Sequence, residues 1–413
     1  MYLDDVLAAQ KRGEARGITS VCSAHPFVLK EALKAFEHPL IEATCNQVNQ
    51  YGGYTGMRPK DFVAYVRRIA EENNIPIENL ILGGDHLGPN VWQNESAESA
   101  MQKSEVMVHD YVVAGFTKIH LDCSMKLADD PKGALDIEKI AQRAARLAKV
   151  AETSLSQRKW ARVEEDLCYV IGTEVPIPGG ATSREEGVNV TKVEDLRQTI
   201  SITRNEFYKA GLQPAWERVI AVVVQPGVEF GDDFVWPYQP DAARELSQFI
   251  DDQPLIYEAH STDYQTRDSL KDLVHDHFSI LKVGPGLTFA FREAVFALAF
   301  IENELVADTE RSNIIQVLDD AMMRRPEYWE KYYRGTNHEE AHRRKFSLSD
   351  RIRYYWVDEG VQKALMKLRQ NLGGKILPYS LLSRFVGEKD LNAGQVIEWK
   401  INKVLDDYSM ACG

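Results

Sequence analysis

The stretch Leu80–Pro89, with the sequence LILGGDHLGP, places a carboxylate directly beside an imidazole. A short apolar run leads into Gly83 and Gly84, and Asp85 and His86 follow. The run is too short for a helix, and glycine and proline follow it closely, so it predicts a buried strand that ends at the surface. The glycines would let the backbone come close to a ligand or a metal. Two hydrogen-bonded polar residues at a strand terminus are the alternative interpretation.

Other predicted strands also end in polar residues. The sets are Ser23 with His25, Glu42 with Thr44 and Asn46, His120 with Asp122 and Ser124, Thr173 with Glu174, and Glu258 with His260. Alternate residues of a strand face the same side, so each set projects together. A core built for stability alone would carry Val, Ile and Leu at these positions.

Four of these strand ends offer ligands for a divalent cation, namely His86, Asp122, Glu174 and His260. Two imidazoles with carboxylates suit zinc, whereas manganese or magnesium would require more oxygen. A single histidine of this kind is more often a satisfied core residue. Convergence of four strand ends favours the metal site instead.

The segment Pro176–Thr191, PIPGGATSREEGVNVT, is the longest predicted loop between the strands. It contains two adjacent carboxylates, Glu185 and Glu186. Long loops of this kind are often parts of active sites, and a mobile carboxylate could carry a proton to or from a substrate. The same two residues could equally form the acidic first turn of the next helix.

The last predicted strand ends in LKVGPGLTFAFREA. Gly284 and Gly286 precede a helix start at Leu287, so backbone N–H groups there could hold a phosphate, with Lys282 adding charge. Barrels often bind phosphates at this place, although Gly-Pro-Gly is also an ordinary turn. Lys282 could alternatively form a Schiff base, but no apolar neighbours that would lower its pKa are evident. Asn46 is a further candidate for contact with the sugar or phosphate.

Apolar strands alternate with amphipathic helices along most of the chain. The predicted strands are Gly17–His25, Leu40–Val48, Leu80–His86, Lys118–Ser124, Tyr169–Val175, Val219–Gln225, Leu255–His260 and Ile280–Val283. The helices between them are predicted at Lys60–Asn73, Ser96–Ala114, Asp136–Leu155, Val193–Ala210, Pro240–Asp251 and Thr266–Asp276. This order predicts a (β/α)8, or TIM, barrel. A doubly wound open sheet would need a GxGxxG fingerprint after the first strand, and none follows VCSAHPF.

A barrel takes about 250 residues, so we divide the chain into a barrel at 1–310 and a helical extension at 311–413 that packs on it. The last barrel helix is expected at Leu287–Val306, and the extension helices at Ser312–Arg324, Ser349–Leu372 and Ala393–Tyr408. The stretch 324–346 is rich in basic and aromatic residues. We favour a solvated connection, but it could also cover the barrel or meet another subunit, including a second copy of this chain.

Composition excludes several classes of function. The chain has 413 residues, a net charge of −13 and 44% apolar residues, which indicates a globular protein and argues against nucleic-acid binding. The five cysteines are an odd number without a CxxC pair, so neither a disulfide framework nor a cysteine zinc site is expected. The polar N-terminal helix does not resemble a signal peptide, and no apolar run is long enough to span a membrane. We therefore expect a cytoplasmic protein.

Seven sequence blocks together carry a family resemblance. They are CSAHPFVLKEAL, CNQVNQYGGYTGMRP, GGDHLGPNVWQ, KIHLDCSM, GTEVPIPGGA, YEAHSTDYQ and LKVGPGLTFAFREA. In this order they resemble the accessory, non-catalytic subunits of D-tagatose-1,6-bisphosphate aldolase, of the GatZ/KbaZ type. The resemblance implies a barrel related to the metal-dependent class II aldolases and a role in galactitol or N-acetylgalactosamine catabolism. It also implies a separate catalytic aldolase subunit, whose activity and stability the chain supports.

The resemblance extends to single residues of the catalytic class II aldolases. Asp85 and His86 resemble a pair in which the aspartate acts as acid or base and the histidine binds zinc. Similar matches exist for a strand-four aspartate, a glutamate with an acidic loop, and a second zinc histidine, at Asp122, Glu174 with Glu185 and Glu186, and His260.

Three departures from that pattern concern the metal and the phosphate. The strand segment AVVVQPGVEF lacks a third zinc histidine, so Gln225 or Glu229 would have to replace it. The tripeptide Ser261–Asp263 stands where a glycine-serine phosphate loop would be, and Gly284 and Gly286 replace substrate-binding polar residues. Losing a ligand weakens a metal site. These departures favour the accessory role over an independent metal-dependent aldolase or 4-epimerase of a ketose or its phosphate. A kinase is disfavoured because GxxxxGK[ST] is absent.

Overall fold

The computed structural model describes residues 2–133, 135–157, 167–172 and 188–413. Within them, eight parallel strands close a barrel in chain order, with β1 paired to β10. The barrel strands are β1 Ile18–Val21, β2 Leu40–Thr44, β3 Ile81–Leu87, β4 Lys118–Leu121, β5 Cys168–Gly172, β6 Val219–Val223, β9 Ile256–Ala259 and β10 Phe278–Val283. A short antiparallel hairpin, β7 Glu229–Phe230 and β8 Val235–Trp236, lies outside the barrel. The predicted (β/α)8 barrel is confirmed.

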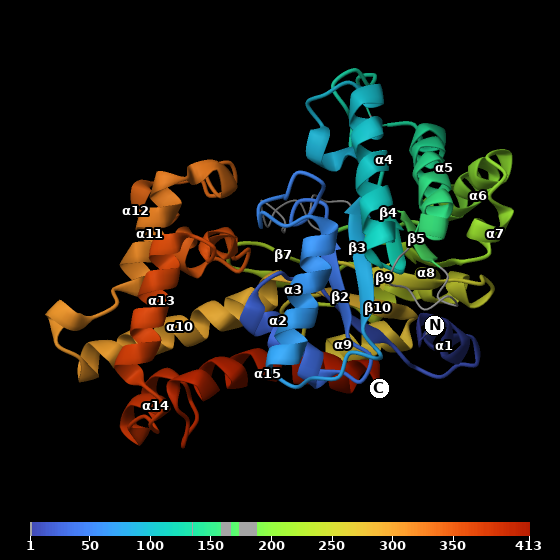
Figure 1. The fold of residues 1–413 in the computed structure, drawn as a ribbon. Coiled ribbons are helices and arrows are strands. Elements are labelled where there is room, and N and C mark those ends of the chain that lie inside the picture. The colour runs from blue at the N-terminus through green and yellow to red at the C-terminus, as the bar shows by residue number, and fades with distance from the viewer. Residues whose placement is uncertain (1, 134, 158–166, 173–187) are drawn as a thin grey trace.

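Helices surround the strands (Figure 1). They are α2 Pro26–Ala35, α3 Pro59–Glu72, α4 Ala97–Ala114, α5 Ile137–Ser154, α6 Val193–Lys209, α7 Gln213–Trp216, α8 Pro240–Asp251, α9 Arg267–His275 and α10 Pro285–Leu305. Each presents an apolar face to the barrel; in α3, Phe62, Val66 and Ile69 are buried. The helices predicted from these faces are therefore confirmed to within a few residues.

Helix α1, Tyr2–Lys11, closes the N-terminal end of the barrel. Its Leu3 and Val6 pack in one apolar cluster with inward-facing strand residues such as Ile18, Leu40 and Ile256. Because apolar residues fill this end, the polar residues of the strands are left to gather at the opposite, C-terminal end.

The C-terminal helices extend to one side of the barrel and then return to it (Figure 1). They are α11 Ile314–Arg324, α12 Asn337–Phe346, α13 Glu359–Leu372, α14 Tyr379–Phe385 and α15 Ala393–Cys412. Helix α15 runs back against the barrel, where Gly17 N donates to Cys412 O at 2.8 Å. Tyr408 Oη donates to Thr262 O at 2.8 Å. The last helix thus ties the extension to barrel loops.

One helix prediction in the extension is wrong. A single helix was expected over Ser349–Leu372, but the chain forms a 3-10 turn, η6 Arg351–Tyr355, before α13 starts at Glu359. Asp350 has a φ of 47°, which is incompatible with a continuous helix. Asp358 then caps α13 by accepting from Gly360 N and Val361 N.

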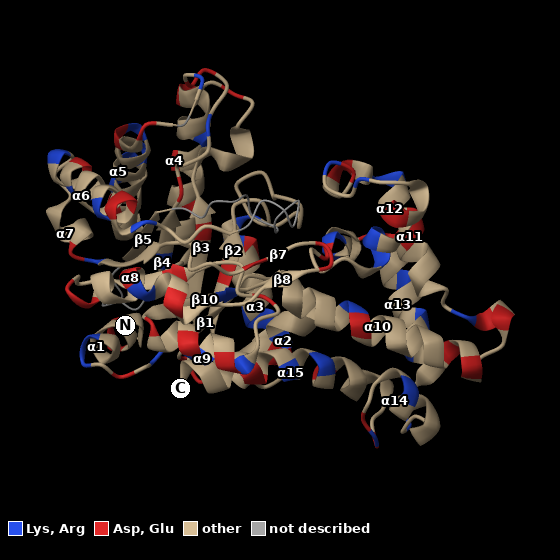
Figure 2. Ribbon diagram, turned by 180° about the vertical axis from the view of Figure 1, so that it is seen from behind, with Lys and Arg blue, Asp and Glu red and all other residues tan. Residues whose placement is uncertain are grey.

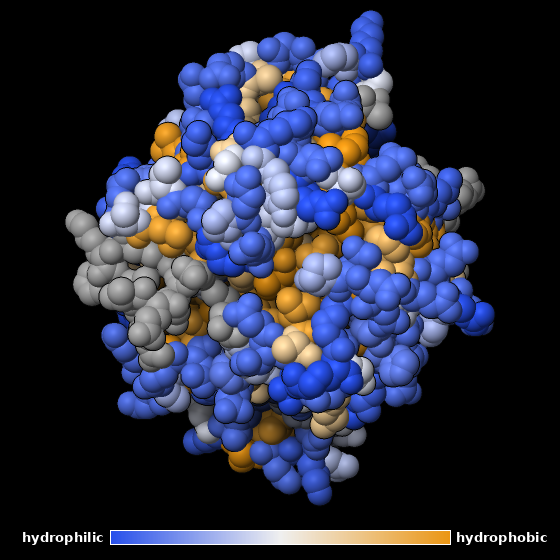
Figure 3. All heavy atoms as spheres, turned by 90° about the vertical axis from the view of Figure 1, so that its right-hand side faces the viewer, coloured by the Kyte–Doolittle hydropathy of each residue, from blue (hydrophilic) through white to orange (hydrophobic). Residues whose placement is uncertain are grey.

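The surface carries charges of both signs. Acidic and basic residues are interspersed along the outer helices, for example on α10 and α15 (Figure 2). The side of the molecule that lies on the right in Figure 1 is mainly hydrophilic, with apolar side chains visible between polar ones (Figure 3). In the part of the chain that the structure describes, no helix combines the length and the apolar character needed to span a membrane.

Candidate functional site

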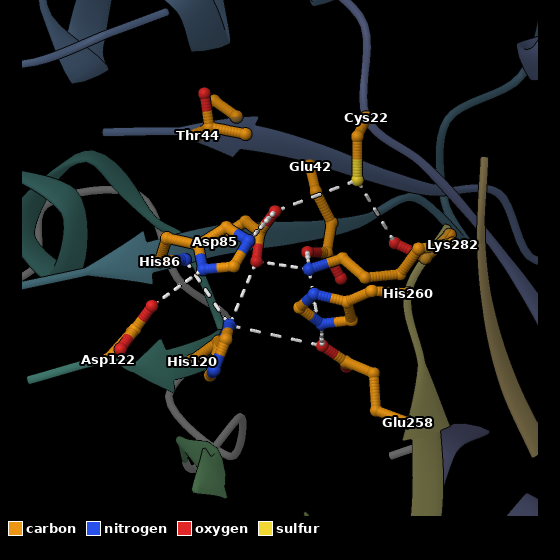
Figure 4. A network of polar contacts seen from close by, with 12 residues as sticks. Cys22, Glu42, Thr44, Asp85, His86, His120, Asp122, Glu258, His260 and Lys282 are labelled. Carbon is orange, nitrogen blue, oxygen red and sulfur yellow. Dashed lines mark hydrogen bonds and ion pairs between the residues drawn. The ribbon is translucent and has the colours of Figure 1, made fainter. Parts of the chain in front are cut away.

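Asp85 and His86 lie at an irregularity in strand β3. The register with β4 shifts between Gly84 and Leu87, and His86 has a φ of 50°, which is uncommon for a residue with a side chain. Neighbouring strand residues normally face opposite sides. The bulge instead lets both side chains reach the same polar cluster (Figure 4). The structure therefore brings together the two residues that the sequence singled out.

Two glycines beside this pair make room for barrel groups. A Cβ atom at Gly83 would lie 2.6 Å from Cγ of Glu42. One at Gly88 would lie 1.7 Å from the carbonyl oxygen of Asp122. The close approach expected from the glycines is thus an approach to the protein's own groups, and Gly83 leaves space for a carboxylate inside the barrel.

Three imidazoles and a carboxylate form the candidate metal centre. Their ligand atoms all lie within 4.8 Å of one another, and the residues are Asp85, His86, His120 and His260. The ring centroids of His86 and His120 are 5.0 Å apart, and those of His86 and His260 are 4.9 Å apart. All four side chains are buried. Of the predicted ligands, His86 and His260 belong to this group; Glu174 lies outside the described residues.

Asp122, predicted as a ligand, lies outside this group of ligand atoms and hydrogen-bonds to His86. Its Oδ2 accepts from His86 Nδ1 at 2.8 Å, while its Oδ1 accepts from Ser124 N at 3.1 Å and Ser124 Oγ at 2.6 Å. Burial raises the pKa of this carboxyl, but the hydrogen bond and charge of His86 outweigh burial and hold the pKa below its usual range. With its proton on Nδ1, His86 has Nε2 available for a cation.

His120 is the functional candidate that the metal prediction missed. Its Nδ1 lies 2.9 Å from Asp85 Oδ1 and accepts from His86 N at 3.3 Å. Its Nε2 lies 3.1 Å from Gly172 O, to which it can donate. Burial lowers the pKa of His120, which favours the neutral ring. The sequence contains the signal, because His120 and Asp122 are two positions apart on one strand and so project to the same side.

Gln225 and Glu229, the expected substitutes for a third histidine, accept hydrogen bonds from nearby backbone amides. Gln225 Oε1 accepts from Gly227 N at 2.8 Å and from Val228 N at 3.0 Å. Glu229 Oε1 accepts from Phe230 N at 2.9 Å. Within the described residues, neither belongs to the cluster of ligand atoms. The third imidazole of the candidate metal centre comes from β4 rather than from the β6 segment.

A layer of buried ion pairs lies below the imidazoles. Lys118 Nζ is 2.5 Å from Glu42 Oε1 and 2.6 Å from Glu258 Oε2, and all three side chains are fully buried. Glu258 Oε1 is also 2.9 Å from His260 Nε2. This layer therefore connects the barrel core to the candidate metal centre (Figure 4).

Lys282 belongs to this layer rather than to a glycine turn. Its Nζ contacts Asp85 Oδ1 and lies 3.2 Å from Glu258 Oε1 and 3.4 Å from Glu42 Oε2. Burial lowers the pKa of Lys282, but these carboxylates outweigh it and raise the pKa well above its usual value. A protonated amine is a poor nucleophile, so the arrangement disfavours a Schiff base. Its charge is compensated by carboxylates and is not available to an external phosphate.

The predicted phosphate site at the last strand is filled by a side chain. Gly284 N and Gly286 N donate to Asp263 Oδ1 at 3.0 and 2.7 Å. Burial of this carboxylate raises the pKa of Asp263 to about 6. The aspartate at the position of a glycine-serine loop therefore supplies the acceptor that a phosphate would have provided.

A cavity of about 1050 Å³ opens above the candidate metal centre. It is lined from the barrel by residues that include Asp85, His86, His260, Lys282 and the predicted substrate contact Asn46. The extension contributes Tyr328, Tyr332, Arg351, Arg353, Tyr354 and Trp356. The site is thus built by both parts of the chain. Glu185 and Glu186, predicted to move protons, lie outside the described residues.

The charge balance of the centre fits a divalent cation. Four carboxylates and two ammonium groups leave two negative charges among the described residues, which are Glu42, Asp85, Asp122, Glu258, Lys118 and Lys282. Three imidazole nitrogens with one carboxylate form a donor set that suits zinc. The arrangement also provides a hydrogen-bonded partner that fixes His86.

The chain is similar to known proteins over its whole length. The model of the family described as D-tagatose-1,6-bisphosphate aldolase subunit GatZ/KbaZ-like matches residues 3–413. Proteins named D-tagatose-1,6-bisphosphate aldolase subunit GatZ from Salmonella dublin and Salmonella gallinarum are each 49% identical over 423 residues, covering 99% of this chain and of the relative.

Solved structures show the same fold. A Sinorhizobium meliloti protein described as a "probable tagatose 6 phosphate kinase" superposes with a TM-score of 0.87 at 43% identity, covering 96% of this chain and 100% of that chain. The fructuronate-tagaturonate epimerase UxaE from Cohnella laeviribosi has a TM-score of 0.51 at 11% identity, covering 95% of this chain and 81% of its own, which shows a shared fold alone.

Proposed function

The chain belongs to the D-tagatose-1,6-bisphosphate aldolase subunit GatZ/KbaZ-like family, and from this premise we propose that it supports a separate catalytic class II subunit of that aldolase. The observation that carries the proposal is 49% identity to proteins named GatZ over 99% of both chains. The role lies in carbohydrate catabolism, and we place it in the cytoplasm, in the breakdown of galactitol or N-acetylgalactosamine. We treat the barrel at 1–310 and the extension at 311–413 as one functional unit, because both line the cavity.

We further propose that the centre binds one divalent cation, with zinc as the first choice. His86, His120 and His260 would hold the cation, with Asp85 beside them. The cation supplies Lewis acidity towards a ketose carbonyl. Asp122 fixes the proton of His86 on Nδ1 and so directs Nε2 into the centre.

The proton-moving groups of the proposal are carboxylates. Asp85 lines the cavity and is our candidate acid or base. Burial raises the pKa of its carboxyl, but the charges of His86 and Lys282 outweigh burial and keep the carboxylate ionised. Glu185 and Glu186 remain our candidates for proton transfer from the loop at 176–191. Asn46 lines the cavity as a candidate contact for a ketose or ketose phosphate.

Co-expression with the class II catalytic subunit tests the subunit role. Aldolase activity towards tagatose 1,6-bisphosphate and the melting temperature of the catalytic subunit should both rise when the chain is present. The control is the same catalytic subunit expressed with an unrelated barrel protein of similar size. Unchanged activity together with an unchanged melting temperature would exclude the proposal.

A second candidate function is favoured by one observation, the third imidazole of His120. Three imidazoles and a carboxylate could hold a cation that polarises a ketose carbonyl, which a metal-dependent ketose or ketose-phosphate aldolase, or a 4-epimerase, requires. The purified, zinc-loaded chain should then convert a ketohexose or its phosphate without a partner. If the chain converts none of these ketohexoses or phosphates, with or without metal, the independent enzyme is excluded and the subunit role is the proposal that stands. The kinase description of the Sinorhizobium protein has no support in this sequence, which lacks GxxxxGK[ST].

A further inference from the structure

Two arginines of the extension face the cavity from the 3-10 turn η6. Arg351 and Arg353 both line the cavity that also contains Asp85 and His260. They are two positions apart on a turn that starts after the left-handed residue Asp350. The irregular backbone that interrupts the expected helix is therefore the segment that delivers two guanidinium groups to the mouth of the barrel.

Arg351 is buried with hydrogen-bonding capacity left unused. Its side chain is 5% exposed, and within the described residues its Nε has no hydrogen-bond partner. Its Nη1 donates to Tyr328 O at 3.2 Å, and its Cζ lies 3.1 Å from the centroid of the Tyr332 ring. Burying a charged donor without an acceptor is costly. This arrangement indicates an acceptor that comes from outside the described residues.

Arg353 is held in place by neutral groups. Its Nη1 donates to Ser349 O at 2.5 Å and to Asp350 O at 3.1 Å, and its Nη2 donates to Tyr354 Oη at 2.8 Å. These bonds orient the guanidinium but do not neutralise it. The carboxylates of Asp350 and Asp263 interact electrostatically with Arg353. Neither forms an ion pair with it within 4.0 Å: Asp350 is bound by Thr288 Oγ1 at 2.6 Å and by Arg292 Nε at 3.3 Å, and Asp263 is bound by two glycine amides.

The other cations of the cavity already have carboxylate partners. Lys282 lies against Asp85, and Arg68 pairs with Glu72 at 3.9 Å. Among the residues that the structure describes, no carboxylate oxygen is paired with Arg351 or Arg353 within 4.0 Å. The backbone donors of Gly284 and Gly286, the usual phosphate position in a barrel, are occupied by Asp263. The positive charges that can bind an anion are thus those of Arg351 and Arg353, on the side of the cavity that the extension forms.

We propose that Arg351 and Arg353 form an anion subsite that binds a phosphate group of a ketose phosphate. The end of the sugar that is remote from this phosphate then points to the imidazole centre. The assignment of the sugar rests on the proposed function; the anion subsite itself rests on the two arginines. Guanidinium groups donate two parallel hydrogen bonds to phosphate oxygens, and such charge-assisted bonds are the strong ones. The phosphate is therefore bound by the extension rather than by the barrel loops.

Calorimetric titration of the full chain, without any partner subunit, tests this inference. The probes are inorganic phosphate, tagatose 6-phosphate and unphosphorylated tagatose. The variants are Arg351→Met and Arg353→Met, with Arg384→Met as the matched control, because Arg384 is exposed on α14 and does not line the cavity. We expect each cavity variant to weaken tagatose 6-phosphate binding at least tenfold, and the control to bind as the wild type does.

The three probes separate the sources of the anion. Stronger binding of tagatose 6-phosphate than of inorganic phosphate, with both weakened in the variants, supports a sugar-phosphate subsite. Loss of inorganic phosphate binding alone, with the sugar phosphate unaffected, would overturn it. Tagatose itself should bind equally to wild type and variants. If Arg353→Met does not fold, the Arg351→Lys variant tests the subsite in its place. Lysine keeps the positive charge but lacks the two parallel donors of a guanidinium, so Arg351→Lys should still weaken sugar-phosphate binding.

These results are independent of the aldolase assay. If the chain stimulates the catalytic subunit while both arginine variants bind tagatose 6-phosphate as tightly as wild type, the subsite is wrong and the proposed function stands. If the variants lose binding while the chain fails to stimulate the catalytic subunit, the subsite stands and the proposed function is wrong.

Discussion

His86 Nδ1 and Asp122 Oδ2 lie 2.8 Å apart across the ends of strands β3 and β4. Both side chains are buried, and the carboxylate is fixed from its other side by Ser124. A buried carboxylate that accepts from one imidazole nitrogen decides which nitrogen is free. The pair therefore sets the direction in which His86 presents its remaining lone pair to the neighbouring imidazoles.

Replacing Asp122 with Asn should weaken zinc binding by about 10 to 100-fold, the usual effect of removing such a partner. The amide keeps the shape but no longer favours the proton on Nδ1 of His86. Zinc affinity measured by competition with a chelator reports the change. Asp252→Asn, on the exposed end of α8, is the control and should bind zinc as wild type does. Equal affinities of Asp122→Asn and wild type would contradict the orienting role.

Replacing His120 with Asn should lower the zinc content of the purified chain from about one ion to a small fraction, because a nitrogen ligand is lost from a four-residue donor set. Elemental analysis after dialysis measures the content. His338→Asn, on the exposed surface of α12, serves as the matched variant. Full zinc content in His120→Asn would show that this imidazole is a hydrogen-bonding core residue.

The barrel was predictable from local pattern alone. A strand such as Val219–Val223 is short and apolar, and the next long helix, Pro240–Asp251, is amphipathic; both properties are visible in a short window of the sequence. Repetition of that unit leaves few possible folds. The boundaries of the barrel helices could likewise be predicted, because apolar periodicity is a property of neighbouring residues.

The site was predictable only in part, because its geometry depends on contacts between distant residues. The glycines before Asp85 are compatible with a bulge as well as with a close approach of the backbone, and the two are distinguished only by the register of β3 against β4. The charge state of Lys282 depends on three carboxylates from other strands. The interruption of the helix before Arg351 likewise could not be predicted, because no proline or glycine lies between Phe346 and Arg351.

Replacing Lys118 with Met should lower the free energy of unfolding by about 3 to 5 kcal/mol, since it leaves two buried carboxylates with Lys282 as their one remaining cation among the described residues. Lys118 Nζ contacts Glu42 at 2.5 Å and Glu258 at 2.6 Å, with no exposure to solvent. Urea unfolding followed by circular dichroism measures the loss. Lys363→Met, at an exposed pair on α13, should change stability little.

A double-mutant cycle with Glu42→Gln checks the cause of that loss. If repulsion between unpaired carboxylates is responsible, Glu42→Gln should cost less in the Lys118→Met background than in wild type, with a coupling of about 0.5 to 3 kcal/mol. Additive losses would instead assign the effect of Lys118→Met to packing of its aliphatic chain.

Asp263 should make the protein less stable as pH rises through about 6. Burial raises the pKa of its carboxyl from 3.8 to about 6 in the folded state, so between these values the folded chain holds a proton that the unfolded chain has lost. The stabilisation is complete below about pH 4 and is lost as pH rises to about 6. Asp263→Asn keeps an oxygen for Gly284 and Gly286 but cannot ionise.

The difference in stability between Asp263→Asn and wild type should therefore change with pH. Between pH 4 and pH 7 it should move in favour of the variant by about 2 to 3 kcal/mol, since one pKa unit corresponds to about 1.4 kcal/mol. Urea midpoints at both pH values measure the difference, and Asp252→Asn should show no such trend. A difference that stays constant from pH 4 to pH 7 would mean that Asp263 ionises in the folded protein as easily as in the unfolded chain, and that its hydrogen bonds to the two glycine amides compensate fully for its burial.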